Sequence, residues 1–304
     1  MFSQQRVRSA LLSTFAVLLL CVLSAGAPGA GVSQATTLSP VKASSMTTTS
    51  SCDPLTRFDS NNFSNPTTID NRWLPLIPGM QLTLDGYANR GGGLLPHQVV
   101  FTVTDVTKVI DGVRTVVIWD RDISEGQLAE AELSFFAQDD AGNVWNLGEY
   151  PEEYEDGTFL GAPSTWIAGL AGAEGGIHML ATPQLGTSWY LQGSAPTIGF
   201  LDCAKVFKKG ETICVPVKCY TDVLVTDEVS PLDQTGGHQL KYHAPTVGIV
   251  QVGAVADKEG ETLVLTKNVR LSPSALAKAR QAALKLDKHG YQVSDVYRQT
   301  PPAQ

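Results

Sequence analysis

The sequence predicts a mainly β protein, an antiparallel meander that forms a half-barrel or open barrel with one C-terminal helix. Three observations predict this fold. Short runs rich in β-branched and aromatic residues, separated by turn residues, fill residues 78–271. Strands and helices do not alternate, which disfavours a parallel sheet. One helical pattern, at residues 272–290, follows the last run.

The chain begins with the pattern of a secretory signal peptide. Arg6 and Arg8 precede an apolar run from Phe15 to Leu23, and small residues follow. The run has nine residues, too few to span a bilayer. We expect cleavage near residue 29 or 35, so that residues 1–35 are lost and no transmembrane segment remains. The mature protein is then secreted, either extracellular or associated with the cell wall.

Amino-acid composition predicts the nature of the segment after the leader, and the net charge narrows the kinds of partner that the protein can bind. Residues 36–52 are rich in serine and threonine without an aromatic residue, so we expect a flexible tether that cannot bury enough apolar area to offset its ordering entropy. The chain has 22 basic and 30 acidic residues, a net charge of −8. This balance excludes the basic footprint of a nucleic-acid-binding protein. The same balance is compatible with binding of an apolar ligand.

Two hairpins are predicted inside the β domain, residues 53–271. Asp111 and Gly112 join two β-branched runs, and both positions of such a turn need positive φ. In residues 129–138 apolar and polar side chains alternate, and the loop at 140–142 turns the chain back.

The second hairpin has one apolar face. Its expected register puts Ala137 opposite Trp145 and Phe135 opposite Leu147, so the apolar side chains coincide. Small alanines opposite a large tryptophan indicate a curved sheet that wraps its own core or a cavity.

A long irregular segment follows this hairpin. Between Glu149 and Gly186 the strand pattern gives way to an acidic run and then to a stretch rich in glycine and alanine around Trp166. Such a long loop is typical of a lid, rim or binding element. Further strands are expected at residues 188–192, 202–208, 211–217, 221–228, 238–243, 247–255 and 261–269.

One helix closes the chain, at residues 272–290. Ser272 is its N-cap, Pro273 its first residue, and Gly290 its terminator. Its narrow, alanine-rich apolar stripe suits packing on the sheet better than insertion into a membrane. The tail, residues 291–304, is expected to run along the surface.

Four cysteines remain after the leader: Cys52, Cys203, Cys214 and Cys219. An even number in an exported chain, without CxxC or CxxH spacing, favours two disulfides over zinc. Three connectivities are open. A turn at residues 208–210 would bring Cys203 near Cys214 but not opposite it, which slightly favours Cys203 with Cys219 and Cys52 with Cys214.

The stretch FFAQDDAGNVWNLGE, residues 135–149, resembles a hairpin of an uncharacterised family of secreted bacterial β proteins. The likeness continues in NRWLPL at 71–76, GGI at 175–177 and YHAPTVG at 242–248. The last motif is also similar to the closing strands of bacterial lipoprotein-type half-barrels, and this resemblance implies a fold that holds lipids or other apolar cargo. Ser134 stands where the family tends to place an acid, which weakens a metal site here.

The expected function is noncatalytic binding of a small apolar or lipid-like ligand in the concave face of the sheet. The side chains expected to border it are Phe135, Trp145, Leu147 and Trp166. The plainer interpretation is that these residues only fill the core.

Three alternatives remain open. An extracellular hydrolase would use two carboxylates as acid and base, from the set Asp120, Glu130, Asp139 and Glu149. Calcium, as the one cofactor considered, would bind in the acidic run through Glu152, Glu153, Glu155 and Asp156. A wall-associated structural protein would need neither site. No GxSxG, HExxH or P-loop motif is present, and the pattern does not indicate an oligomeric state.

Overall fold

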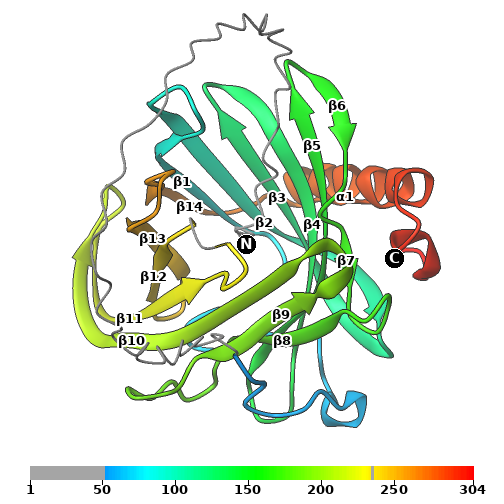
Figure 1. Cartoon of the computed structure of the whole chain (residues 1–304), viewed down its shortest axis with the longest axis horizontal. Helices are drawn as coiled ribbons and strands as arrows, with labels where there is room; N and C mark the ends of the chain where they lie inside the picture. Colours follow the sequence, from blue (N-terminus) through cyan, green and yellow to red (C-terminus); the bar gives the residue numbers. More distant parts are fainter. Residues whose placement is uncertain (1–51, 234–235) are drawn as a thin grey trace, which may run out of the picture. The chain divides into compact units, whose positions relative to one another are not determined.

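A computed structural model describes residues 52–233 and 236–304, and these residues form a closed antiparallel β-barrel (Figure 1). Twelve strands make the ring, in the order β4-β3-β2-β1-β14-β13-β12-β11-β10-β9-β8-β5, and pairing of β4 with β5 closes it. The expected mainly β class with one C-terminal helix is confirmed. The expected open or half-barrel is corrected to a closed one.

The ring strands are β1 Met80–Asn89, β2 Leu94–Ile110, β3 Val113–Ser124, β4 Gln127–Gln138, β5 Val144–Glu155, β8 Glu174–Met179, β9 Tyr190–Ala195, β10 Phe200–Cys214, β11 Cys219–Val229, β12 His238–Ala244, β13 Gly248–Val255 and β14 Thr262–Arg270. Two short strands, β6 Thr158–Gly161 and β7 Trp166–Ile167, pair with β5 outside this order. The helix is α1, Pro273–Val293, and three 3-10 turns are Ser60–Asn62, Pro196–Ile198 and Tyr297–Gln299.

The first predicted hairpin forms as expected. Ile110 pairs with Val113, and the two turn residues between them have positive φ, 46° at Asp111 and 80° at Gly112. In the β4–β5 hairpin Ala137 pairs with Trp145 as predicted. The predicted pairing of Phe135 with Leu147 is wrong, because the register shifts there, and Ser134 pairs instead with Glu149.

The apolar face of this hairpin lies on the outside of the barrel. Leu133, Phe135, Trp145 and Leu147 share one buried cluster with Ala283 and Leu286 of α1 and with Tyr297. These four side chains therefore border the outer wall of the barrel and not its concave face. Alternation shows which side of a strand is buried, but a helix packed on the outer wall buries that side as well as a barrel interior does.

The helix and the tail are both docked on the barrel. Ser272 caps α1 as predicted, because its hydroxyl accepts from the Ala275 backbone N–H at 3.2 Å. The helix continues past Gly290, where a side chain would collide with the Tyr297 ring. Instead of running along the surface, the tail buries Tyr297 completely and pairs Gln304 with Thr107 of β2 through two backbone hydrogen bonds of 2.8 Å.

Half of the predicted long loop is strand. β5 continues to Glu155, and β6, β7 and β8 follow, the last of them ending at Met179. Trp166 is only 2% exposed, so its part of the segment packs into the wall.

The disulfides differ from the favoured pairing. Cys52 bonds to Cys203, and Cys214 bonds to Cys219 across the end of the β10–β11 hairpin. The predicted turn at 208–210 does not form, because β10 continues through Gly210 to Cys214. Disulfides form in oxidising compartments, so the chain is an extracellular or envelope protein.

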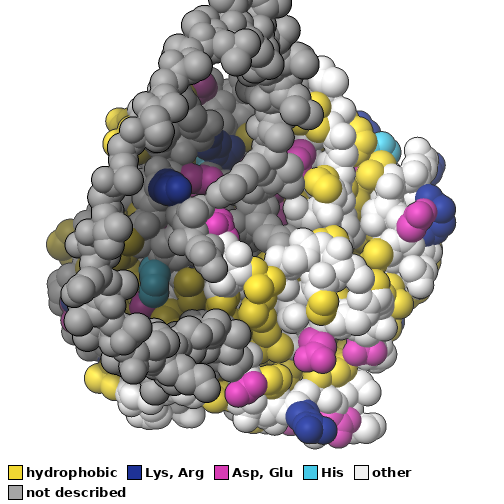
Figure 2. All heavy atoms as spheres, viewed as in Figure 1, with side chains coloured by type: hydrophobic (Ala, Val, Ile, Leu, Met, Phe, Trp, Pro, Cys, Tyr) yellow, Lys and Arg dark blue, Asp and Glu magenta, His cyan; other side chains and the backbone are white. Residues whose placement is uncertain are grey.

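Two predictions about the start of the chain lie outside the described residues: the signal peptide at 1–35 and all of the 36–52 tether except Cys52. Within the described ranges, the structure contains no helix that has both the length and the apolarity needed to cross a membrane. On the face shown in Figure 2, acidic and basic side chains are spread among neutral ones without forming a single large patch.

Candidate functional site

The barrel interior changes from apolar to polar along its strands. Side chains of every second residue point inward, and at one end they belong to an apolar core that Trp73, Leu74 and Leu76 also join. From the apolar toward the polar end, the inward series are Phe101, Val99 and His97 on β2; Ile118, Asp120 and Asp122 on β3; and Phe136, Ser134 and Glu132 on β4. Ionisable side chains thus gather in one half of the interior, which we call the polar half.

Glu132 and Glu149 form a pair of buried acids on the neighbouring strands β4 and β5. They are 1% and 4% exposed. Asn146 Nδ2 donates to Glu149 Oε1 at 2.7 Å, and Trp166 Nε1 donates to Oε2 at 3.1 Å. Burial raises the pKa of both carboxyls, and the neighbouring Glu149 raises the pKa of Glu132 further. The pair therefore keeps a proton to a higher pH than ordinary glutamates do.

Asp202, Glu228 and Lys241 come from β10, β11 and β12. Lys241 Nζ lies 2.5 Å from Glu228 Oε2. Burial acts to lower the pKa of Lys241, but Glu228 outweighs it, so the pKa is raised and the ammonium stays charged. Burial, with Glu149 as the next cause, raises the pKa of Asp202 well above its ordinary value. Because β5 and β10 are not neighbours in the ring, the interaction of Glu149 with Asp202 crosses the interior.

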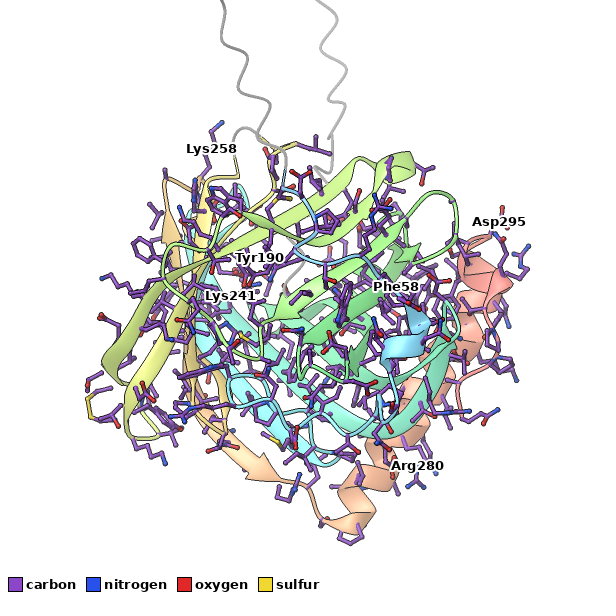
Figure 3. All side chains as sticks on the ribbon, turned by 90° about the horizontal axis from the view of Figure 1, so that it is seen from below. Phe58, Tyr190, Lys241, Lys258, Arg280 and Asp295 are labelled. Carbon is purple, nitrogen blue, oxygen red and sulfur yellow. A yellow bond between two sulfur atoms is a disulfide. The ribbon has the colours of Figure 1, made fainter. Side chains whose placement is uncertain are left out.

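Figure 3 gives the same arrangement in space. Tyr190 and Lys241 lie toward the middle of the ring of strands, whereas Arg280 and Asp295 lie at its periphery. The polar half is thus lined from several strands at once.

Two histidines of the polar half are neutral at neutral pH. Burial holds the pKa of His178, on β8, well below its ordinary value, and burial lowers that of His243, on β12, to about 4. A neutral imidazole has one donor and one acceptor nitrogen, so both side chains are suited to bind a polar group.

Several buried polar atoms of this interior have no hydrogen-bond partner among residues 52–233 and 236–304. They are Glu132 Oε1, Ser134 Oγ, His178 Nε2, Tyr190 OH and Asp202 Oδ1. Buried polar atoms in folded proteins are nearly always hydrogen-bonded, because an unmet one costs about 1–3 kcal/mol. These atoms therefore mark where a polar partner is to be expected.

Contacts between acidic and basic side chains border the polar half next to the β1–β2 turn. His97 Nε2 lies 2.9 Å from Glu261 Oε1, and His97 Nδ1 lies 3.3 Å from Asp122 Oδ1. Arg90, in the β1–β2 turn, lies 2.5 Å from Asp122. These acids already have basic partners, unlike the acids of the Glu132–Glu149 pair.

The structure does not bring the four expected ligand-binding residues together in the interior. Phe135, Trp145 and Leu147 lie in the outer cluster beneath α1. Trp166 packs against Phe200 at 5.1 Å between ring centroids and donates to Glu149. Of the four, Trp166 alone has a direct hydrogen bond to the polar half.

Of the four candidate acids, Asp120, Glu130 and Glu149 all lie close enough to Glu132 to raise its pKa, whereas Asp139 lies elsewhere. Asp120 and Glu149 are buried in the interior, and Glu130 lies beyond Glu132 on the same face of β4. Asp139 is held in the β4–β5 turn, where it accepts from the Trp145 indole at 2.8 Å and from Asn143. Its role is to fix the turn.

The acidic run is not a single exposed cluster. Glu152 is 1% exposed and accepts from the hydroxyls of Tyr150 and Tyr154, both at 2.5 Å. Burial raises the pKa of Glu153. In the part of the chain that the structure describes, no group of three or more histidine, cysteine or acidic side chains is arranged to hold a metal ion.

Sequence reasoning missed Glu132, Asp202, His178 and Lys241 as site residues. One signal was present: Glu130, Glu132 and Ser134 alternate with the apolar residues of β4. Alternation of this kind is typical of a strand with one face exposed to water. A polar barrel interior gives the same pattern, because period 2 distinguishes two faces without saying which is inside.

Comparisons with known proteins give the following. No family model and no curated protein matches the chain. Among solved structures it is similar to a protein from Bacteroides fragilis described as exported, with a YmcC-like fold, at 14% identity and a TM-score of 0.36, covering 66% of this chain and 99% of that one. It is also similar to a protein from Parabacteroides distasonis described as a lipoprotein, at 13% identity, a TM-score of 0.31 and the same coverage.

Proposed function

We propose that this exported protein is a noncatalytic binding protein that holds a small organic cation in the polar half of its barrel. The observation that carries the proposal is the set of buried polar atoms without partners, contributed by β4, β8, β9 and β10. Ligand sites are typically enclosed by mostly apolar walls with a few converging polar groups. The apolar core at one end and the polar half at the other supply both.

The charge of the interior favours a cation. Lys241 is matched by Glu228, and His178 and His243 are neutral. The acids with raised pKa values, Glu132, Glu149 and Asp202, thus outnumber the cations available to them among the described residues. A bound cation would stabilise their ionised forms, so binding would release protons and strengthen as the pH rises.

Calorimetric titration with 1,4-diaminobutane tests this, and 1,4-butanediol is the matched neutral probe. We expect saturable binding of the diamine alone, with proton release seen as a dependence of the heat on the buffer. Asp202→Asn should weaken binding at least tenfold, and Glu174→Gln, at an exposed site on β8, should not. Equal binding of diamine and diol, or no binding of either, would contradict the proposal.

Native mass spectrometry of the protein purified from its own culture medium provides a second test. A bound mass that disappears on denaturation, and that is absent from the Asp202→Asn variant, would identify the physiological ligand. Retention of that mass by the variant would place the ligand elsewhere.

A hydrolase is the second candidate, because Glu132 and Glu149 are interacting acids with raised pKa values on neighbouring strands. Such a pair suits the general acid and base of glycoside hydrolysis. Release of nitrophenol from a panel of nitrophenyl glycosides, lost in Glu149→Gln, would establish it. Absence of turnover together with diamine binding would leave the noncatalytic function.

A further inference from the structure

A groove of about 520 Å³ runs between α1 and the outer barrel wall. It is separate from the polar half, because its wall residues lie on the outward faces of β3, β4 and β5. Trp119, Ala131 and Tyr154 line it from the strands, and Ala282 and Leu286 line it from the helix. Its volume is within the range of pockets that hold small molecules, and its floor is apolar.

The acid in the groove is already satisfied. Glu152 accepts from Tyr150, from Tyr154 and from His289, whose Nδ1 lies 2.6 Å away. Because three groups donate to this carboxylate, its lone pairs are occupied, and it fixes Tyr154 and His289 in the groove wall.

The helix side of the groove is basic. The single acid of α1, Asp287, is buried against Lys108, so the exposed surface of the helix has no acid. Lys285 and Lys288 are exposed, line the groove, and make no ion pair within residues 52–233 and 236–304. Two unmatched ammonium groups therefore border an apolar floor on a chain whose net charge is −8.

We propose that this groove binds a single-chain amphiphile with an anionic head, taken up as a free molecule. The tail lies on Trp119, Ala131 and Leu286, and the head is bound by Lys285 and Lys288. An ammonium group at the edge of an apolar surface keeps its charge in water while its stem covers the tail. Charge complementarity selects an anionic head over a neutral one.

Calorimetric titration with laurate, below the concentration at which it forms micelles, tests the proposal. Monolaurin has the same chain and an uncharged head, so it is the matched probe. We expect one laurate per chain and at least tenfold weaker binding of monolaurin. The double variant Lys285→Gln/Lys288→Gln should also weaken laurate binding at least tenfold. Lys278→Gln, on the same helix and outside the groove, is its control.

A plugging variant tests the tail site. Ala282→Phe places a ring in the groove and should abolish laurate binding with a melting temperature close to that of the parent. Laurate binding that survives both Ala282→Phe and the double lysine variant would overturn the proposal, as would equal affinity for laurate and monolaurin.

Two further measurements distinguish binding in this groove from binding in the barrel interior and from docking on a membrane. Asp202→Asn, which tests the interior, should leave laurate binding unchanged. Sedimentation with phosphatidylglycerol vesicles should show no binding that depends on Lys285 and Lys288. Lysine-dependent vesicle binding without uptake of free laurate would instead identify a membrane-docking surface and overturn the proposal.

Discussion

Glu132 shows how one residue couples the interior to pH. Its carboxyl is buried, and burial together with Glu149 raises its pKa well above 4.5. The folded chain therefore keeps a proton that the unfolded chain releases. At pH values between the pKa of Glu132 in the unfolded chain and its pKa in the folded chain, the free energy of unfolding falls by about 1.4 kcal/mol for each unit that the pH rises.

Replacing Glu132 should accordingly stabilise the ligand-free protein in a pH-dependent way. Glu132→Gln keeps the shape of the protonated acid, so we expect no change in melting temperature below about pH 4 and a gain that grows as the pH rises above the ordinary glutamate pKa. Thermal unfolding followed at a series of pH values measures this. Glu174→Gln should leave the profile of the parent, and a Glu132→Gln gain of equal size at all pH values would show that protonation is not its cause.

The contribution of His178 to stability has the opposite pH dependence, and it changes at lower pH. Burial lowers its pKa, so the unfolded chain binds a proton that the folded chain excludes. This contribution to stability is present above about pH 6.5 and is lost as the pH falls through that value toward the folded pKa.

At the scale of elements, α1 is held on the barrel by a buried ion pair. Lys108 Nζ of β2 lies 2.8 Å from Asp287 Oδ1 and donates also to the Tyr291 hydroxyl and the Pro301 carbonyl, both at 2.7 Å. Tyr297 donates to the same Asp287 oxygen at 2.7 Å. The pair thus joins strand, helix and tail, and each of its charges has several partners.

Removing one charge of this pair should lower the stability of the fold strongly. Lys108→Met leaves a buried, uncompensated carboxylate, so we expect a loss of about 3–5 kcal/mol in the free energy of unfolding. The double variant Lys108→Met/Asp287→Leu removes both charges and should recover a large part of that loss. Urea unfolding of the two single variants and the double variant measures the coupling, and strict additivity would show that the two residues do not interact.

The two disulfides constrain chain segments of very different length. Cys52 and Cys203 are 151 residues apart, whereas Cys214 and Cys219 are 5 apart. Loop-closure entropy gives about 5 kcal/mol for the long loop and about 2 kcal/mol for the short one. We expect Cys52→Ser/Cys203→Ser to lower the melting temperature more than Cys214→Ser/Cys219→Ser does. Calorimetry of both variants tests the order, and the reverse order would show that native-state strain dominates.

At the scale of the whole molecule, the barrel depends on the pairing of β1 with β14, which we call the seam because these are the first and the last strand in the chain. β1 pairs with β14 from Met80 with Arg270 to Tyr87 with Thr262. At Gly86 the strands approach so closely that a Cβ atom would lie 1.7 Å from the Thr262 carbonyl oxygen. Glycine is therefore required there for the ring to close.

A methyl group at this point should open the seam. Gly86→Ala is expected to lower the melting temperature strongly and to increase hydrogen exchange in β1 and β14 before the other strands. Gly253→Ala, in β13, adds the same methyl group where the nearest atom would be 3.9 Å away, so it is the control. Equal effects of the two substitutions would show that the seam is not specially sensitive.

The candidate site was less predictable than the fold. The β4–β5 hairpin and the pair Ala137–Trp145 next to its turn were predicted because their signals are local. The pairing of Glu149 with Ser134, and its interaction with Asp202, depend on a register shift and on segments more than fifty residues apart. Patterns of neighbouring residues in the sequence do not predict contacts between such distant segments.

The sequence by itself determined the strand content, the turn at Asp111-Gly112, the start of the helix at Ser272 and the presence of two disulfides, because periodicity, turn chemistry and capping act within a few residues. Only the tertiary structure decided which face of each strand is inside. Once α1 covers the outer wall, the apolar face is buried there, and the polar face, with Glu132 and its partners, turns into the barrel.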